Sequence, residues 1–215
     1  MRISPPPYGQ HCVFLGVTGS GKSVLARELL TRYQSYFVFD MQESMKLSGV
    51  VVRDPANAAK LINKGTPRII YRPRRIYQER EISNYILDKL LDSSSSENPH
   101  PRIIYIDEIF QLGYMQSFPD NLPKGMTFSR QRQLSFWIST QRPKLIPTNI
   151  LAQASHFFVF YQNNEGDKER IAEFAPRSDE FLAAEDSLQY QDYRFIYINH
   201  TNMTFQLYNK LRVRA

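Results

Sequence analysis

The first stretch of this sequence that is suited to chemistry is residues 16–23, whose order is Gly-Val-Thr-Gly-Ser-Gly-Lys-Ser. Its glycines let the backbone turn tightly and direct successive N–H groups into one concave anion site. Lys22 can reach the β- and γ-phosphates of a nucleotide, and the Ser23 hydroxyl can take one position on Mg²⁺. An apolar run before the stretch and an amphipathic run after it favour strand, turn and helix, the context of a Walker A phosphate loop. The predicted phosphate-binding residues are Gly16, Val17, Thr18, Gly19, Ser20, Gly21, Lys22 and Ser23.

A pair of acidic residues forms the second candidate part of a nucleotide site. Asp107 and Glu108 follow the apolar run Ile103–Ile106, a Walker B pattern in which a buried strand delivers them to one edge of a sheet. Asp107 is expected to bind Mg²⁺, and Glu108 to take a proton from the attacking water as a general base. Two solvated acids at a strand end are the alternative, which the phosphate loop upstream makes less favoured.

The third candidate is Gln141, which with Thr140 follows the apolar run Leu134–Ser139. A polar side chain there can lie between the metal-binding carboxylate and the γ-phosphate, where it would hold the attacking water. A strand end that is merely capped by polar residues is the alternative. Glu108 and Gln141 both favour water as the acceptor, whereas a small-molecule kinase would need an acceptor site and a lid. The sequence therefore predicts nucleotide hydrolysis.

The elements that must position these residues alternate between strands and helices. This alternation predicts an α/β fold, a mostly parallel central sheet covered by helices on both faces, with a C-terminal β-hairpin. Residues 1–10 are proline-rich and are expected to form an extended lead-in to a single domain over residues 1–215. Pro119 and Pro123 predict an irregular loop over Gly113–Gly125.

The boundaries follow from hydrophobic periodicity and from the positions of turn residues. The predicted strands are His11–Leu15, Tyr36–Phe39, Val50–Arg53, Arg68–Tyr71, Arg102–Ile106, Leu134–Ser139 and His156–Tyr161, with a hairpin of Tyr193–Ile198 and Met203–Tyr208. The predicted helices are Val24–Tyr33, Pro55–Asn63, Tyr77–Leu91 and Asp167–Phe174.

Composition places the chain among ordinary globular proteins, since 42% of its 215 residues are hydrophobic and 22% are charged. The net charge of +6 fits either a polyanionic partner or simply a basic soluble surface. Cys12 is the one cysteine, which excludes an intramolecular disulfide and indicates a reducing compartment. No apolar run approaches the length of a membrane span, and the histidines lack metal-ligand spacing, so neither a span nor a zinc site is expected.

A longer stretch around Gln141 carries a resemblance to a known family. Arg130–Pro143, whose order is Arg-Gln-Arg-Gln-Leu-Ser-Phe-Trp-Ile-Ser-Thr-Gln-Arg-Pro, resembles the FtsK/HerA superfamily of DNA-pumping ATPases. Ile146–Ala154 with the following apolar run, and the pair Phe39-Asp40, are similar to the family as well, so the resemblance extends over Val13–Tyr161. The chain departs from the family after Asp40, where a proline-containing turn is common, and this leaves the role of Asp40 open.

The resemblance implies a RecA-like P-loop ATPase that binds ATP and Mg²⁺ and works as a ring, usually a hexamer, with a pentamer as the other expectation. In that family an arginine from one subunit completes the ATP site of the next and stabilises the transferring phosphoryl group. Arg130 matches this arginine best and Arg132 is the close alternative; both could instead be cations that face solvent or DNA. The candidate catalytic residues are Lys22, Glu108, Arg130, Arg132 and Gln141, and the candidate metal ligands are Ser23 and Asp107.

Within this family the chain most resembles the ATPases that package double-stranded viral DNA into a preformed capsid. This resemblance implies duplex DNA and a capsid or portal-vertex protein as partners, in the cytoplasm of the host cell and at the packaging vertex. The candidate DNA contacts are Arg72, Arg74, Arg75 and Lys124, with a solvated charged surface as the other interpretation. An ATPase of the filamentous-phage assembly type and a plasmid or conjugative DNA-transfer ATPase are the alternatives.

Overall fold

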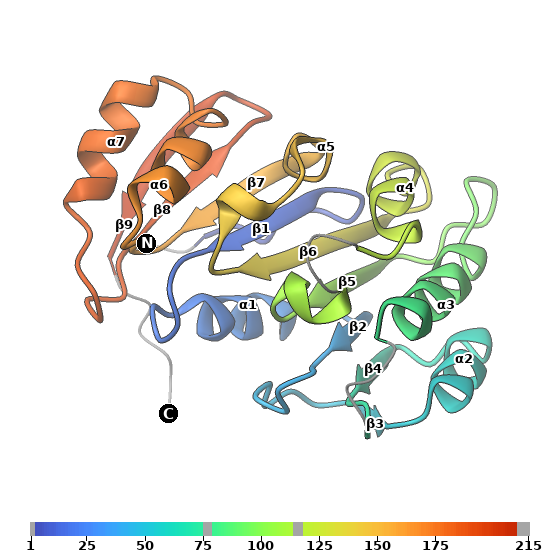
Figure 1. The fold of residues 1–215 in the computed structure, drawn as a ribbon. Coiled ribbons are helices and arrows are strands. Elements are labelled where there is room, and N and C mark those ends of the chain that lie inside the picture. The colour runs from blue at the N-terminus through green and yellow to red at the C-terminus, as the bar shows by residue number, and fades with distance from the viewer. Residues whose placement is uncertain (1–2, 75–78, 114–117, 210–215) are drawn as a thin grey trace.

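The computed structural model describes residues 3–74, 79–113 and 118–209, which fold around one central sheet (Figure 1). The strands are β1 (His11–Leu15), β2 (Tyr36–Phe39), β3 (Val50–Val52), β4 (Arg68–Tyr71), β5 (Arg102–Ile106), β6 (Leu134–Thr140), β7 (Ala154–Val159), β8 (Phe195–Asn199) and β9 (Thr204–Tyr208). The α-helices are α1 (Lys22–Leu30), α2 (Pro55–Asn63), α3 (Glu79–Asp92), α4 (Asn121–Phe128), α5 (Thr148–Leu151), α6 (Glu165–Ala172) and α7 (Ser178–Asp186). Short 3-10 helices follow β5 and β6, η1 (Ile109–Leu112) and η2 (Pro143–Leu145).

The order of the strands is β3-β4-β2-β5-β6-β1-β7-β8-β9 in the described part of the chain. All neighbours from β3 to β7 are parallel, whereas β8 is antiparallel to both β7 and β9. The mostly parallel sheet and the C-terminal hairpin predicted from the sequence are therefore confirmed. Each parallel connection passes through a helix or a long loop, because parallel strands need a crossover.

The two faces of the sheet are covered by different elements. Side chains alternate along a strand, so Val13 and Leu15 of β1 pack with the apolar sides of α2 to α7, whereas Cys12 and Phe14 pack with α1 on the other face. Burial raises the pKa of the Cys12 thiol. The expected cover on both faces is confirmed. Among the helices of the described ranges, none is both long and apolar enough to cross a bilayer.

The segment from Gly113 to Gly125 differs from its prediction as an irregular loop, because α4 begins at Asn121. Pro123 is the third residue of this helix, where a missing N–H breaks no intrahelical hydrogen bond. Gly125 lies inside the helix because a Cβ atom there would come 2.6 Å from Cζ of Phe136 on β6. Here Pro123 belongs to the first turn of a helix, and Gly125 allows the helix to pack closely on β6. Residues 114–117 of the predicted loop lie outside the described residues.

Other boundaries shift by a few residues, and two further helices of the described ranges, α5 and α7, were not predicted. α1 begins at Lys22 rather than Val24, and the hairpin begins at Phe195, which leaves Tyr193 in the loop before it. The helix α7 had no sequence prediction, since its apolar residues are few and its amino end carries an exposed arginine in the left-handed conformation. The predicted start of the third helix at Tyr77 lies outside the described residues.

Residues 3–10, part of the predicted lead-in, contain no helix or strand. Its carbonyl groups accept hydrogen bonds from the end of α1 and the turn after it: Arg32 donates to O of Ile3 at 2.9 Å, and the Tyr33 hydroxyl donates to O of Pro6. The N–H of Gly9 donates to Oγ of Ser135 on β6 at 2.8 Å. The lead-in is thus attached to the face of the sheet that α1 covers.

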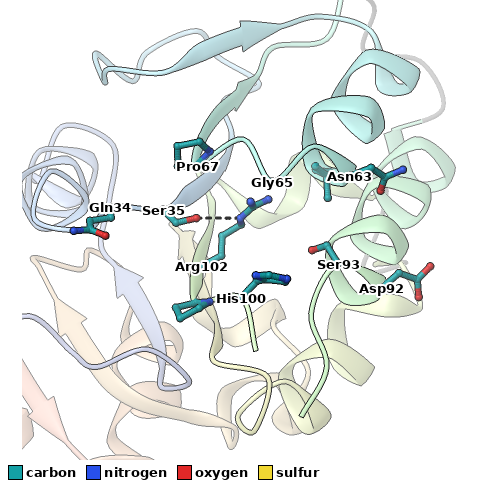
Figure 2. Close-up of a pocket in the computed structure, with 11 residues that line it drawn as sticks. Gln34, Ser35, Asn63, Gly65, Pro67, Asp92, Ser93, His100 and Arg102 are labelled. Atoms are coloured by element: carbon teal, nitrogen blue, oxygen red, sulfur yellow. Dashed lines mark hydrogen bonds between the residues drawn. The ribbon is translucent and has the colours of Figure 1, made fainter. Parts of the chain in front are cut away.

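A cavity of about 460 Å³ opens at the amino ends of β2, β4 and β5, and Figure 2 shows its lining side chains. Arg102, the first residue of β5, is buried among them and donates from Nε to Oγ of Ser35 at 3.2 Å and from Nη2 to O of Thr66 at 3.0 Å. Burial lowers the pKa of this guanidinium. Arg102 therefore joins the amino ends of three strands, at the edge of the sheet opposite to the phosphate loop.

Candidate active site

The sheet topology brings most of the candidate residues to one edge. β1, β6 and β5 are parallel neighbours with β6 in the middle, so their carboxyl ends lie side by side. β1 leads into the phosphate loop, β5 leads into Asp107 and Glu108, and Gln141 follows the end of β6. Gln141 therefore lies between the phosphate loop and the acidic pair, the position that its proposed contact with the attacking water requires.

The phosphate loop has a backbone conformation that its glycines allow. The φ angles of Gly16, Gly19 and Gly21 are 150°, 77° and 113°, in the region that side chains disfavour. Gly21 is followed directly by α1, whose first N–H groups lack intrahelical acceptors and carry the positive end of the helix dipole. The N–H of Val17 donates to O of Tyr161 at 3.1 Å, which attaches the loop to the end of β7. These features are those of an anion-binding helix start.

Two polar side chains of this loop would gain better partners from a phosphate. Lys22 is buried and donates from Nζ to O of Gly16 at 2.6 Å and to O of Val17 at 2.9 Å. Desolvation lowers the pKa of Lys22 to about 8, although two nearby carboxylates act in the opposite direction. The hydroxyl oxygen of Ser20 is buried and has no hydrogen-bond partner among the described residues. Phosphate oxygens would satisfy both groups, so the loop fits a nucleotide.

Asp107 lies at the centre of a group of hydroxyls. Its Oδ1 accepts hydrogen bonds from Oγ of Ser23 and from Oη of Tyr105, both at 2.9 Å, and its Oδ2 accepts one from Oγ of Ser44 at 2.9 Å. Hard oxygen ligands of this kind suit Mg²⁺, which binds few protein groups and takes its other ligands from phosphate and water. Ser23 and Asp107 thus fit the predicted metal site. In the described ranges, His, Cys, Asp and Glu side chains form no group of three that could hold a metal ion.

Asp40 holds the loop that carries Ser44, one of the hydroxyl groups around Asp107. It is fully buried, and its Oδ1 accepts the N–H of Ser44 at 2.9 Å while its Oδ2 accepts Nε of Arg72 at 2.8 Å. Arg72 also donates from Nη2 to O of Met45 at 2.8 Å. The ion pair therefore holds the loop that brings Ser44 to Asp107. Arg72, a candidate DNA contact, thus uses Nε and Nη2 for contacts within the protein.

Glu108 has the features of a strained functional residue. Its φ angle of 78° and ψ angle of 95° are unusual for a residue with a side chain, and such strain is concentrated at functional sites. Its Oε1 is buried and has no hydrogen-bond partner within the described part of the chain. Desolvation raises the pKa of Glu108, and the charge of Lys22 is the largest opposing effect. A carboxylate with a free, desolvated oxygen can accept a proton from water.

Gln141 contacts the phosphate loop directly. Its Oε1 accepts a hydrogen bond from Oγ1 of Thr18 at 2.6 Å. The next residue, Arg142, pairs through Nε with the buried Oδ2 of Asp167 on α6 at 3.0 Å, and the same carboxylate accepts the N–H of Lys144 at 2.9 Å. This pairing fixes the turn after β6, and with it the position of Gln141.

The two candidate arginines are not part of this group. Arg130 is exposed and precedes β6, while Arg132 donates from Nη1 to O of Leu91 at 2.9 Å, at the end of α3. Both lie at the amino end of β6, and a strand of this length separates its ends by about 20 Å. The site of the same chain is therefore beyond their reach. Of the other candidate DNA contacts, Arg74 and Lys124 are exposed, and Arg75 lies outside the described residues.

Several residues at this site had no sequence prediction. Ser44 reaches Asp107 from a loop after β2, and Asp167 reaches Arg142 from α6. Tyr190 and Tyr193, in the loop between α7 and β8, lie against Gly19 and Gly21 of the phosphate loop. None of these contacts has a local pattern, because each joins residues that are distant along the chain. The aromatic composition of the C-terminal part was the one available signal, and its simplest interpretation is packing within the sheet.

Comparison with known proteins yields matches in structure and none in sequence. No protein-family model and no curated protein sequence matches the chain. The genome packaging NTPase B204 from Sulfolobus turreted icosahedral virus 2, in complex with ATP-gammaS, superposes with a TM-score of 0.74 at 17% identity over 94% of this chain and 98% of its own. B204, the DNA-packaging ATPase from Sulfolobus turreted icosahedral virus, gives 0.73 at 15% identity over 96% and 100%.

A protein of another kind is similar as well. The bacterial conjugative coupling protein TrwBdeltaN70 superposes with a TM-score of 0.68 at 11% identity, covering 97% of this chain and 86% of its own. At identities this low, the superpositions establish the fold alone, and function must be argued from the residues of the site. The loop at residues 16–23, the carboxyl ends of β5 and β6, and these superpositions agree: the chain has the fold of the viral genome-packaging NTPases.

Proposed function

We propose that this protein hydrolyses ATP to ADP and phosphate with Mg²⁺ bound. The observation that carries the proposal is the meeting of a phosphate loop, an Asp-Glu pair and a glutamine at the carboxyl ends of three adjacent strands. Lys22 lies near both carboxylates, Asp107 accepts a hydrogen bond from the Ser23 hydroxyl, and Gln141 contacts the loop. The fold is shared with NTPases solved with ATP-gammaS and AMPPCP.

Each side chain has a role that its surroundings support. Lys22 would exchange two carbonyl groups for oxygens of the β- and γ-phosphates. Ser23 and Asp107 would hold Mg²⁺, which would neutralise charge on the phosphates. Glu108 accepts a proton from a water molecule as the water oxygen bonds to the γ-phosphorus. The bond between that phosphorus and the β–γ bridging oxygen breaks, and ADP leaves with the electron pair. Gln141 orients the water.

Phosphate release from MgATP tests the reaction. Lys22→Ala should abolish measurable turnover, because the charge that binds the phosphates is removed, while Lys64→Ala, at the exposed end of α2, should behave as the unmodified protein. Full turnover in Lys22→Ala would contradict the proposed site.

The proposed task of this hydrolysis is to move double-stranded DNA into a viral capsid. Support comes from the net charge of +6, from exposed cations such as Arg74 and Lys124, and from the shared fold with two proteins described as packaging enzymes. The proposed partners are duplex DNA and a capsid or portal-vertex protein, in the host cytoplasm and at the packaging vertex. Conjugative DNA transfer is the second candidate, because the fold is also that of a coupling protein.

Duplex DNA provides the test of this task. ATP hydrolysis should rise when duplex DNA is added, and DNA affinity should fall steeply as salt increases, since phosphate contacts release counterions. If DNA neither binds in this way nor stimulates hydrolysis, the translocase proposal should be abandoned. Co-sedimentation with empty capsids separates the two candidates: binding supports packaging, and its absence alongside DNA stimulation favours transfer.

We further propose that the working form is a ring in which Arg130 or Arg132 completes the site of the neighbouring subunit. The support is positional, since both residues lie about 20 Å from the site of their own chain. A mixture experiment tests it. Arg130→Ala and Glu108→Gln should each be inactive alone, and mixing them should restore turnover, because one pairing combines an intact phosphate site with an intact arginine. Arg132→Ala in the same mixture identifies which arginine acts; no recovery with either contradicts the shared site.

A further inference from the structure

The loop between α7 and β8, residues 187–194, lies beside the phosphate loop (Figure 1). The hydroxyl oxygen of Tyr190 is 3.2 Å from the position that a Cβ atom on Gly19 would occupy. Atom Cδ1 of Tyr193 is 3.4 Å from the corresponding position on Gly21. Two tyrosines from the far end of the chain therefore contact two glycines of the loop that is proposed to hold the phosphates of ATP.

These tyrosines differ from the other aromatic residues of the C-terminal part. Tyr197 and Tyr208 pack within the sheet, where their rings stack on Phe158 and Phe195. Tyr190 and Tyr193 remain 53% and 45% exposed. Tyr190 does touch Tyr161, but the centroids are 6.1 Å apart and the rings are tilted by 56°. Large ring surfaces next to the phosphate loop are thus left open to a ligand.

The loop that carries these rings is held in place by its own hydrogen bonds. The carboxylate of Asp192 accepts the N–H of Gln189 at 3.2 Å, the N–H of Arg194 at 2.9 Å and Nε of Arg194 at 2.6 Å. Gln191 and Tyr193 have positive φ angles of 66° and 58°, which are uncommon for residues with side chains. Such a conformation persists where the surroundings fix it. The rings are therefore presented in a defined position, which lowers the entropy cost of binding.

We propose that Tyr190 and Tyr193 form the nucleobase subsite, on which the base of the bound nucleotide stacks while its phosphates occupy residues 16–23. The proposal rests on the nucleotide binding proposed above. A planar base has a π-face that suits exposed tyrosine rings, and stacking of this kind tolerates every base. The position of the rings, in contact with glycines of the phosphate loop, favours the nucleotide itself over DNA as the ligand.

A comparison of ATP with inorganic tripolyphosphate isolates the base. Both carry the phosphates, so both should bind the protein when Mg²⁺ is present, and calorimetric titration measures each dissociation constant. Tyr190→Ala should weaken ATP binding by about 5- to 150-fold, the usual range for loss of one base–aromatic stack, and leave tripolyphosphate binding unchanged. Tyr190→Phe should bind ATP as the unmodified protein does. Tyr85→Ala, which removes an equally exposed ring on α3, is the matched control.

Three results would overturn the subsite. The first is an unchanged ATP affinity in Tyr190→Ala and in the Tyr190→Ala/Tyr193→Ala double variant. The second is an equal loss of affinity for ATP and for tripolyphosphate. The third is a variant that loses only the assembly of subunits into an oligomeric ring. Tyr190→Leu keeps apolar bulk without a planar ring, so it tests the stack even if the alanine variants fold poorly. An unmodified protein that binds neither ATP nor tripolyphosphate would instead contradict the proposed function.

Discussion

At the amino end of β1, His11 is buried with both ring nitrogens hydrogen-bonded. Just beyond the carboxyl end of β5, a carboxylate oxygen of Glu108 is buried and has no hydrogen-bond partner among the residues that the structure describes. Nε2 of His11 lies 2.7 Å from O of Met126, and Nδ1 accepts the N–H of Phe136 at 2.9 Å. The partners of His11 are backbone groups of fixed position. Glu108, on the other hand, keeps a desolvated oxygen available.

The same contrast separates the two basic residues of these edges. Arg102 donates to Ser35 and Thr66 at the amino ends of the strands, and these contacts join neighbouring elements. Lys22 donates to carbonyl groups of its own loop, contacts that a phosphate can replace. Arg102 thus stabilises the fold at the amino edge, whereas Lys22 makes contacts at the carboxyl edge that a phosphate can exchange.

The largest effect is expected for Glu108→Gln. Turnover should fall by about 10²- to 10⁴-fold, the usual contribution of a general base, while ATP affinity stays close to that of the unmodified protein. The free energy of unfolding should not fall, because a desolvated carboxylate is removed. Glu185→Gln is the control, because the buried carboxylate of Glu185 pairs with Lys168. This variant should lower the free energy of unfolding and leave turnover per folded molecule unchanged. Normal turnover in Glu108→Gln would contradict the assignment of the base.

The next effect concerns acid stability at the amino edge. Burial lowers the pKa of His11 to about 4, so between its ordinary value near 6.5 and pH 4 the unfolded chain takes up a proton that the folded chain refuses. His11 should therefore cost stability as pH falls through this window, up to about 3 kcal/mol by linkage. Urea unfolding at pH 7 and pH 5 measures the slope. His11→Gln should flatten it, and an unchanged slope would contradict the role of this residue.

A smaller effect is expected for Ser44→Ala. Loss of the hydrogen bond to Oδ2 of Asp107 should raise the Mg²⁺ concentration needed for half-maximal hydrolysis about tenfold, the lower end of the range for groups that orient metal ligands. Maximal turnover at saturating Mg²⁺ should change little. Ser96→Ala, on an exposed loop, is the control. An unchanged Mg²⁺ requirement would show that Ser44 does not orient Asp107.

The smallest effect is a pH dependence of ATP affinity. The free protein has a Lys22 pKa of about 8, and bound phosphates should raise it, so affinity is full below pH 8 and falls above it by at most about tenfold per unit. Titrations from pH 7 to 9.5 in two buffers of different ionisation enthalpy should show proton uptake above pH 8. Lys22→Arg, which stays charged, should give a flat profile over this range. A flat profile in the unmodified protein would contradict the shifted pKa.

The sequence was sufficient for those parts of the site whose chemistry lies in contiguous residues. Residues 16–23 and the pair Asp107-Glu108 are recognisable because spacing along the chain already fixes their geometry. The parallel sheet was predictable because its buried strands are mostly apolar and do not alternate with polar residues as half-exposed strands do. Gln141 was predictable as a strand-end residue, although its contact with Thr18 depends on β6 lying beside β1.

The remaining features depend on contacts that no local pattern records. Ser44 meets Asp107 only because the ion pair of Asp40 and Arg72 folds the intervening loop, and Arg72 by itself looked like a free cation. The helix α4 was not predicted because its sequence contains Pro123 and Gly125. Pro123 is tolerated in the first turn, and Gly125 is explained by the close packing on Phe136. Long-range packing overrides local propensity at each of these places.

The position of strand β6 has a consequence for the order in which neighbouring subunits would hydrolyse ATP. It begins just after Arg130, ends at Thr140 beside the phosphate loop, and is buried along its whole length between β5 and β1. A strand held on both sides cannot flex by itself, so a shift at one end must displace the other. If Arg130 serves the next subunit, a single rigid strand connects two consecutive ATP sites. The order in which the subunits of a ring hydrolyse ATP would then depend on one rigid strand in each subunit, which couples neighbouring sites.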